Sequence, residues 1–118
     1  MQAPIVWFEV VGTDAEALQA YYQQLFGWQF TDMPGPAPYG AVNVAEGQVP
    51  GGVGAAPFGE GWSCFYVGVP DLDAAIARGV ELGGQVLQPR TDLPDISIAV
   101  LADPEGHPYG LAMNTATS

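Results

Sequence analysis

One pattern occurs twice in this chain, 57 residues apart. The first copy runs from Phe8 to Gly27 and the second from Phe65 to Gly84, and matching positions such as Asp14 and Asp71 keep that offset. Each copy has strand-like residues, a turn, an amphipathic stretch and a glycine stop. One copy alone would leave a bare sheet face and too little core, so the duplication predicts a fold that needs both halves.

Hydrophobic patterning extends each copy to the order βαβββ. We expect an α+β fold of two tandem βαβββ modules in a single domain, 1–118, with module one at about 4–57 and module two at about 62–113. The predicted strands are Ile5–Val11, Trp28–Phe30, Tyr39–Glu46, a glycine-rich strand within 47–61, Trp62–Val69, Gln85–Gln88, Ile96–Ala102 and Tyr109–Met113. Residues 89–95 are expected to be a polar connection.

Local signals define the helix ends and turns. Thr13, with Glu16 three residues later, has the form of a capping box. Gly27 is placed to end the first helix in a left-handed conformation, and the second helix should run from Asp71 to Leu82. An apolar stripe on the first helix predicts a buried face of Ala17, Leu18, Tyr21, Tyr22 and Leu25. Asp103–Gly106 has the residues of a type I turn.

The charge balance limits the partners. Thirteen acidic residues face two basic ones, and the formal net charge is −11. Nucleic acid and anionic membranes are poor partners because binding them requires Lys and Arg. Such a charge would attract a cationic small molecule, or it could serve only solubility. The single Cys64 excludes an internal disulfide, and no secretory signal or long apolar run is present, so we expect a cytoplasmic protein.

Several short motifs follow one another in order over nearly the whole chain. They are Phe8-Glu9 with Asp14, the run from Tyr21-Tyr22 to Leu25-Phe26-Gly27-Trp28, the run from Val67 to Ala75, Leu82-Gly83-Gly84, and Asp103-Pro104-Glu105-Gly106 followed by Tyr109-Gly110-Leu111. Together they resemble the vicinal oxygen chelate superfamily of glyoxalase I, bleomycin-resistance proteins, fosfomycin-resistance enzymes and extradiol dioxygenases. The resemblance implies two modules forming a half-open curled sheet, a homodimer, and a ligand held inside the curl.

Metal-dependent members of that superfamily hold their ion with His, Gln or Glu from two kinds of position. The first-strand positions, seven residues before each helix-opening Asp, are here Trp7 and Cys64. The last-strand position is Gly110, and the offset of 57 gives Val53 as its mate. Trp, Val and Gly side chains offer no ligand atom, and one thiolate is too few. The resemblance therefore implies that the metal site is lost, and we expect no cofactor.

Strand alternation predicts which side chains face the ligand. Trp7 and Glu9 share one face of the first strand, while Phe8 and Val10 face the helix. The same phase puts Cys64 and Tyr66 on the ligand side of the second module, and Phe65, Val67 and Val69 in its core. The predicted ligand-binding set is Trp7, Glu9, Asn43, Cys64, Tyr66 and Gly110.

Glu9 is the candidate catalytic residue because it is an acid on an otherwise apolar strand. It could bind a ligand or act as a general base, or it could bond a neighbouring strand or face water at a rim. Cys64 fits a small buried hydrophobe better than a reactive thiol, and His107 fits a solvated turn better than a catalyst. Trp28, Tyr39, Phe58 and Trp62 flank loops and could stack on a planar ligand or simply pack.

These residues favour a metal-free protein that binds a small cationic or aromatic molecule with Glu9 as its polar handle. An alternative is a glyoxalase-like lyase or isomerase, or a dioxygenase-type enzyme. Such an enzyme would use Glu9 as general base, or a metal if the ligand positions are misaligned. A third possibility is a structural or regulatory module whose own side chains fill the cavity. The segment 47–61 could be a lid, a weak strand or a site of close approach.

Overall fold

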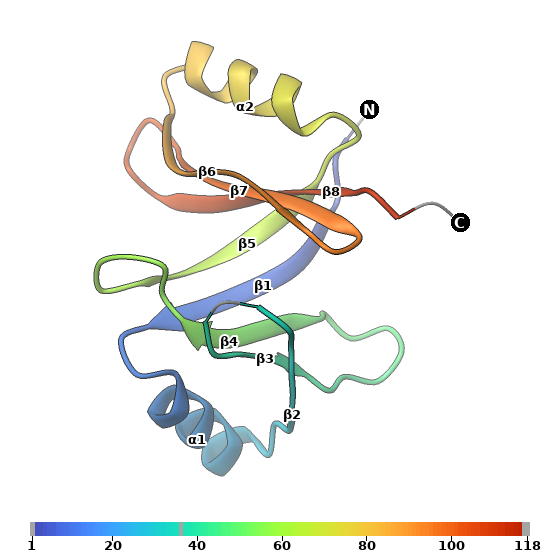
Figure 1. Cartoon of the computed structure of the whole chain (residues 1–118), viewed down its shortest axis with the longest axis vertical. Helices are drawn as coiled ribbons and strands as arrows, with labels where there is room; N and C mark the ends of the chain where they lie inside the picture. Colours follow the sequence, from blue (N-terminus) through green and yellow to red (C-terminus); the bar gives the residue numbers. More distant parts are fainter. Residues whose placement is uncertain (1, 36, 117–118) are drawn as a thin grey trace. The chain divides into compact units, whose positions relative to one another are not determined.

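The computed structural model describes residues 2–35 and 37–116 (Figure 1). Its elements are β1 (Ile5–Gly12), α1 (Ala15–Phe26), β2 (Phe30–Asp32), β3 (Tyr39–Val42), β4 (Gly51–Ala55), β5 (Trp62–Gly68), α2 (Leu72–Glu81), β6 (Gln85–Leu93), β7 (Ile96–Ala102) and β8 (Pro108–Asn114). This order confirms the α+β fold of two βαβββ modules. None of the helices in the described residues is long and apolar enough to span a membrane.

The chain divides into two compact units that follow the repeat. The first unit is Trp7–Ser63, and the second combines the residues from Cys64 onward with the N-terminal residues up to Val6. The start of β1 therefore belongs to the second unit, where the amide of Gly68 donates to the carbonyl of Pro4 at 2.9 Å.

In the first unit the strands lie in the order β2-β3-β4-β1, with β1 and β4 parallel and the other pairs antiparallel. Helix α1 packs on this sheet through β4. Its N-cap is Asp14, whose carboxylate accepts from the amide of Ala17 at 3.0 Å, so the Thr13–Glu16 capping box was a wrong prediction. Gly27 ends α1 with φ 73°, as predicted.

In the second unit the order is β5-β8-β7-β6, with β5 and β8 parallel. Helix α2 begins after Asp71, which accepts from the amide of Ala74, and it covers β6, β7 and β8. Its core is a cluster of buried apolar residues: Leu72, Ala99, Leu101 and Leu111, with Val67, Val69, Ala75 and Ile76 packed around it. The predicted inward phase of Val67 and Val69 is therefore confirmed.

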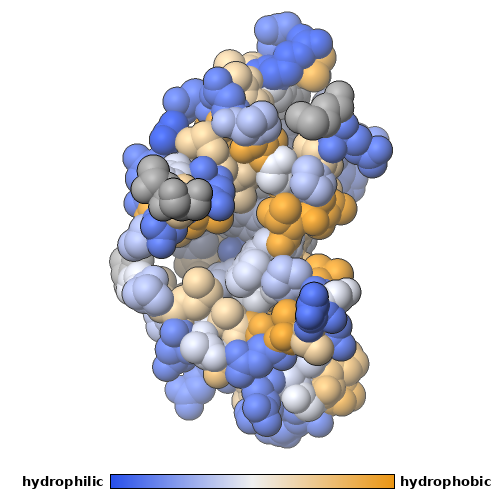
Figure 2. Space-filling view, turned by 90° about the vertical axis from the view of Figure 1, so that its right-hand side faces the viewer, coloured by the Kyte–Doolittle hydropathy of each residue, from blue (hydrophilic) through white to orange (hydrophobic). Residues whose placement is uncertain are grey.

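Several sequence predictions of burial and extent were wrong. Phe65 is 46% exposed, and on α1 Tyr21 and Leu25 are more than half exposed. The apolar stripe of α1 is thus only partly covered. Strand β6 continues to Leu93 through two register shifts, where a polar connection was predicted. Figure 2 shows apolar side chains among hydrophilic ones on the face that it displays.

The glycines of β4 make room for aromatic rings. A Cβ on Gly51 would lie 2.0 Å from the ring of Phe8, and one on Gly52 would lie 2.1 Å from the ring of Tyr39. Both distances are far below van der Waals contact. Aromatic rings therefore approach the backbone of β4 closely, which was one of the explanations predicted for the glycines of segment 47–61.

Candidate functional site

Glu9 is a buried carboxylate in the middle of β1. Its side chain is 8% exposed, and its Oε2 accepts a hydrogen bond from the indole Nε1 of Trp62 at 3.0 Å. A buried charge requires such a partner because the protein interior replaces the water that would solvate it. The structure therefore contradicts the water-facing rim among the predicted alternatives. Trp62 is in turn packed against Phe58, with ring centroids 5.2 Å apart.

A second polar contact joins aromatic residues on the same face of the sheet. Trp7 Nε1 donates to the hydroxyl of Tyr39 at 2.9 Å. Trp7 and Glu9 are two residues apart on β1, so their side chains share one face of the strand. Glu9 pairs with Gly52, and the Tyr39 ring lies over that glycine. On the opposite face, Phe8 contacts Trp28 beside α1, with centroids 5.5 Å apart. The predicted facing of Trp7, Glu9 and Phe8 is therefore what the structure has.

The second unit has a corresponding arrangement. Tyr66 is 4% exposed and pairs with Gly110. A Cβ on Gly110 would lie 2.3 Å from the Tyr66 ring. Cys64, two residues earlier on β5, is partly buried. In each unit, therefore, a tyrosine ring covers the glycine that pairs with the middle of the first strand.

Strand register corrects one of the predicted family positions. Gly110 pairs with Tyr66, and Glu9, the repeat mate of Tyr66, pairs with Gly52. The mate of Gly110 is therefore Gly52 and not Val53. Val53 pairs with Gly40, where a Cβ would meet the Gln19 side chain of α1, so Val53 lies on the helix side. Glycine has no side-chain atom that could bind a metal either. With Gly52 in place of Val53, the four family positions are Trp7, Gly52, Cys64 and Gly110, and among them only Cys64 has a side chain that could bind a metal.

Two other candidates lie away from these contacts. Asn43 is exposed just beyond β3, and its Oδ1 accepts from the hydroxyl of Thr31 at 2.7 Å. His107 is an exposed turn residue whose Nδ1 lies 3.1 Å from Oδ2 of Asp103. Within residues 2–35 and 37–116, no three His, Cys, Asp or Glu side chains gather closely enough to hold a metal ion.

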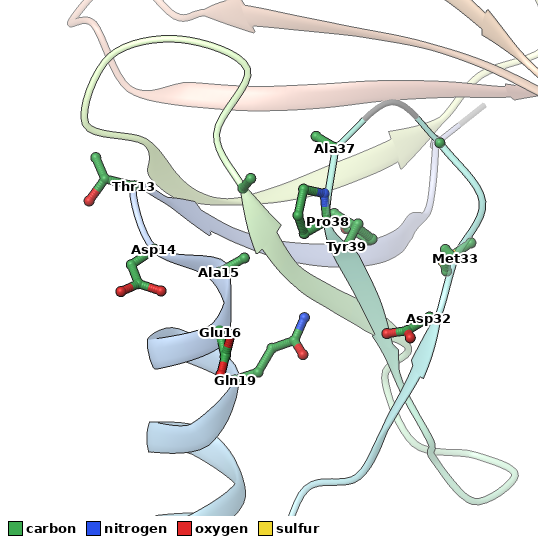
Figure 3. Close-up of a pocket in the computed structure, with 12 residues that line it drawn as sticks. Thr13, Asp14, Ala15, Glu16, Gln19, Asp32, Met33, Ala37, Pro38 and Tyr39 are labelled. Carbon is green, nitrogen blue, oxygen red and sulfur yellow. The ribbon is translucent and has the colours of Figure 1, made fainter.

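The first unit also contains a cavity of about 870 Å³ that the sequence did not indicate. Asp14, Glu16 and Gln19 border it from the start of α1, and Asp32 and Tyr39 border it from the β2–β3 segment (Figure 3). No local motif could have predicted it, because its two walls are distant in sequence. Its carboxylates give it a negative potential, and Tyr39 connects it to the contact with Trp7.

The two basic side chains are both paired. Arg78 forms an ion pair with Glu81, and Arg90 contacts Asp73 at 2.8 Å and Asp92 at 2.9 Å. The Ser97 hydroxyl and the Arg90 guanidinium lower the pKa of Asp92 by hydrogen bonding to its charged form. Both arginines therefore form ion pairs with carboxylates of the second unit.

Comparison with known proteins agrees with this architecture. A curated relative from Mycobacterium bovis, "Putative glyoxylase CFP32", is 33% identical over 114 residues, which cover 89% of this chain and 43% of the relative. The same-named protein of Mycobacterium tuberculosis matches equally. The chain thus spans less than half the length of the curated relatives that it matches.

Solved structures show the same fold at low identity. A hypothetical protein, BH1468, from Bacillus halodurans superimposes with a TM-score of 0.71 at 14% identity, covering 100% of this chain and 99% of that one. Streptomyces coelicolor methylmalonyl-CoA epimerase gives a TM-score of 0.68 at 18% identity, with 100% and 99% covered. The family model described as "Glyoxalase-like domain" matches residues 7–112. The chain therefore belongs to the glyoxalase-like domain family, within the vicinal oxygen chelate superfamily.

Proposed function

We propose that this chain binds a small organic molecule without a metal ion, on the aromatic sheet face around Glu9. The observation that carries the proposal is the tyrosine ring over each last-strand glycine. A metal-binding side chain at position 52 or 110 would have to occupy the space of the Tyr39 or Tyr66 ring. Aromatic packing thus takes the place in which the superfamily's ligand residues would stand.

The chemistry of this face favours an aromatic ligand that is neutral or cationic. Trp7, Tyr39 and Trp62 are only partly buried and offer ring faces and edges, and Glu9 offers a carboxylate. A CoA ester, which the epimerase structures bind, carries several phosphate charges. This chain has only two basic residues, and both are paired with carboxylates. A net charge of −11 would repel such an anion and attract a cation.

Metal content tests the first part of the proposal. The protein is purified without chelators, and its metals are quantified by mass spectrometry under native and denaturing conditions. We expect no divalent ion at stoichiometric level. One ion per chain, lost together with ligand binding on chelation, would refute the metal-free function.

Ligand binding tests the second part. A library of neutral and cationic aromatic compounds is screened by thermal shift on wild type, Glu9→Gln and Glu60→Gln. A ligand at about 100 times its Kd stabilises by about 2.7 kcal/mol, which raises Tm by about 10 °C for a domain of this size. We expect this shift to be lost in Glu9→Gln and kept in Glu60→Gln, whose carboxylate is exposed. Equal shifts in both variants would contradict the role of Glu9.

A second candidate function is general-base catalysis by Glu9. It is favoured by the curated relative named a glyoxylase and by the buried carboxylate held by Trp62. Such a base would remove a proton from the carbon beside a carbonyl group. Hydrogen–deuterium exchange at that carbon, followed by NMR with small carbonyl compounds in D₂O, would reveal it. Exchange that is abolished in Glu9→Gln supports an enzyme, and exchange equal to the buffer rate rejects this candidate for the compounds tested.

A further inference from the structure

A long groove lies between α1 and β2 in the first unit. The cavity of about 870 Å³ continues into a second hollow of about 380 Å³, and both are lined by Glu16, Gln19 and Asp32. Gln19 and Asp32 extend into the space between the two elements (Figure 3). The groove follows the helix from its N-cap Asp14 to Gln23, a rise of about 14 Å at 1.5 Å per residue. This length matches about four residues of extended chain.

One wall of the groove is the open edge of a sheet. β2 is the outermost strand of the first unit, and among the described residues no strand pairs with its outer side. On its inner side, the carbonyl of Gln29 and the amide of Met33 hydrogen-bond toward β3 at 2.8 and 2.9 Å. Alternate residues of an antiparallel strand turn their backbone groups to the partner, so Phe30 and Asp32 direct theirs outward.

The edge strand of the second unit is protected, whereas β2 is not. β6 contains Pro89 and two register shifts, and α2 packs on it. Proline and irregular register prevent a further strand from pairing with an edge. β2 has no proline and no register shift, and α1 packs chiefly on β4. The outer side of β2 is therefore a surface to which another extended segment can add as a strand.

The charges of the groove identify the kind of segment. Asp14, Glu16 and Asp32 line it, and residues 7–63 contain no Lys, Arg or His. The two arginines of the chain are paired with carboxylates of the second unit. A basic partner would supply the positive charge that the first unit lacks. A second copy of this chain, with its net charge of −11, would instead be repelled by Asp32 at the edge.

We propose that the groove binds a basic segment of another protein, which adds to β2 as a further strand. Its main chain pairs with Phe30 and Asp32, and its Lys or Arg side chains contact Glu16 and Asp32. Asp32 pairs with Gly40, where a Cβ would meet Gln19 of α1, so the Asp32 side chain faces the helix. The groove thus lies on the opposite face of the sheet from Glu9, and the proposal does not depend on the ligand site there.

Fluorescein-labelled peptides test this proposal by fluorescence anisotropy. The probe is a capped six-residue peptide that alternates lysine and valine, and a peptide with glutamate in place of lysine is its control. Two further versions of the probe are N-methylated at every lysine or at every valine, so one of them cannot donate hydrogen bonds to β2. Wild type is compared with the double variant Glu16→Gln/Asp32→Asn. The control Glu46→Gln/Glu60→Gln removes the same charge from exposed residues of the same unit outside the groove.

We expect saturable binding of the basic peptide and none of the acidic one. The groove variant should weaken binding by about fivefold or more, and the control variant by less than about twofold. One of the methylated peptides should bind about tenfold more weakly than the other, because it loses two backbone hydrogen bonds. Circular dichroism confirms that both variants are folded.

Three results would overturn the proposal: no binding of the basic peptide, equal binding of the two methylated peptides, or equal weakening in the groove and control variants. Spermine, a small polycation without a peptide backbone, provides a fourth test. If spermine displaces the peptide and binds as tightly, the groove is a site for small cations and not for a strand.

Discussion

The tyrosine ring over Gly52 leads to a prediction about stability. Replacing Gly52 with Ala adds one methyl group, whose carbon would lie 2.1 Å from Cε1 of Tyr39 and 2.3 Å from its hydroxyl oxygen. The ring must therefore move, and its hydroxyl also accepts the hydrogen bond from Trp7. The substitution disturbs both the packing and the polar contact of the candidate site.

The expected magnitude follows from three contributions. Forcing a methyl group into a packed site costs about 1–3 kcal/mol. Losing the hydrogen bond between Trp7 and Tyr39 costs about 1 kcal/mol. Replacing a strand glycine with alanine stabilises the folded state by about 0.5–1 kcal/mol, because alanine loses less backbone entropy on folding. Together these contributions predict that Gly52→Ala lowers the free energy of unfolding by about 1–3.5 kcal/mol.

Urea unfolding followed by tryptophan fluorescence and circular dichroism measures this change. Gly35→Ala is the control, because a Cβ there meets nothing within 4 Å. The clash also predicts coupling: in a Tyr39→Ala background, where the ring is absent, Gly52→Ala should cost less than about 0.5 kcal/mol. The reasoning is refuted if Gly52→Ala is as neutral as Gly35→Ala, or if its cost is unchanged without the Tyr39 ring.

Two further predictions concern the second unit. Backbone amides, that of His107 first, donate hydrogen bonds to the Asp103 carboxylate and hold its pKa below the ordinary value of 3.8. The ionised carboxylate therefore stabilises the fold fully above pH 3.8, and this stabilisation is lost as pH falls through the folded-state pKa. The stability difference between wild type and Asp103→Asn, measured by urea unfolding from pH 6 to pH 2, should shrink below pH 3.8, and a difference independent of pH would contradict this. Leu72 is fully buried, so Leu72→Ala should lower the free energy of unfolding by about 2–5 kcal/mol. Leu82 is exposed, so Leu82→Ala should change that free energy by less than about 0.5 kcal/mol. Comparable losses in the two variants would show that the cluster around Leu72 is not the core of its unit.

Much of the candidate site could be predicted from strand alternation. The period of two residues put Trp7 and Glu9 on one face and Phe8 on the other, and the structure has this arrangement. Partners could not be predicted in the same way. Trp62 reaches Glu9 across 53 residues of sequence, and Tyr39 reaches Trp7 across 32, so no local pattern joins them.

The last-strand position shows where a constant sequence offset fails. The offset of 57 holds through both helices but gives Val53 as the mate of Gly110, whereas hydrogen-bond register gives Gly52. The connections between strands differ in length between the modules, and only the pairing of strands reveals the shift. A shift of one residue reverses the face of a side chain, which is why Val53 lies toward α1.

The α1 stripe is a similar case. Its spacing predicted a helix correctly, because periodicity reports which side chains share a face. Periodicity does not report whether another element covers that face. In the second unit α2 covers β6, β7 and β8, while in the first unit α1 packs chiefly on β4 and leaves Tyr21 and Leu25 exposed.

The sequence by itself determined the duplicated βαβββ architecture, the helix stop at Gly27 and the facing of Glu9, because repeats, caps and alternation are local properties of the chain. The tertiary structure alone decided that Trp62 holds Glu9, that tyrosine rings fill the space over Gly52 and Gly110, and that part of α1 stays exposed. These outcomes depend on which distant segments meet, and packing in three dimensions fixes that choice.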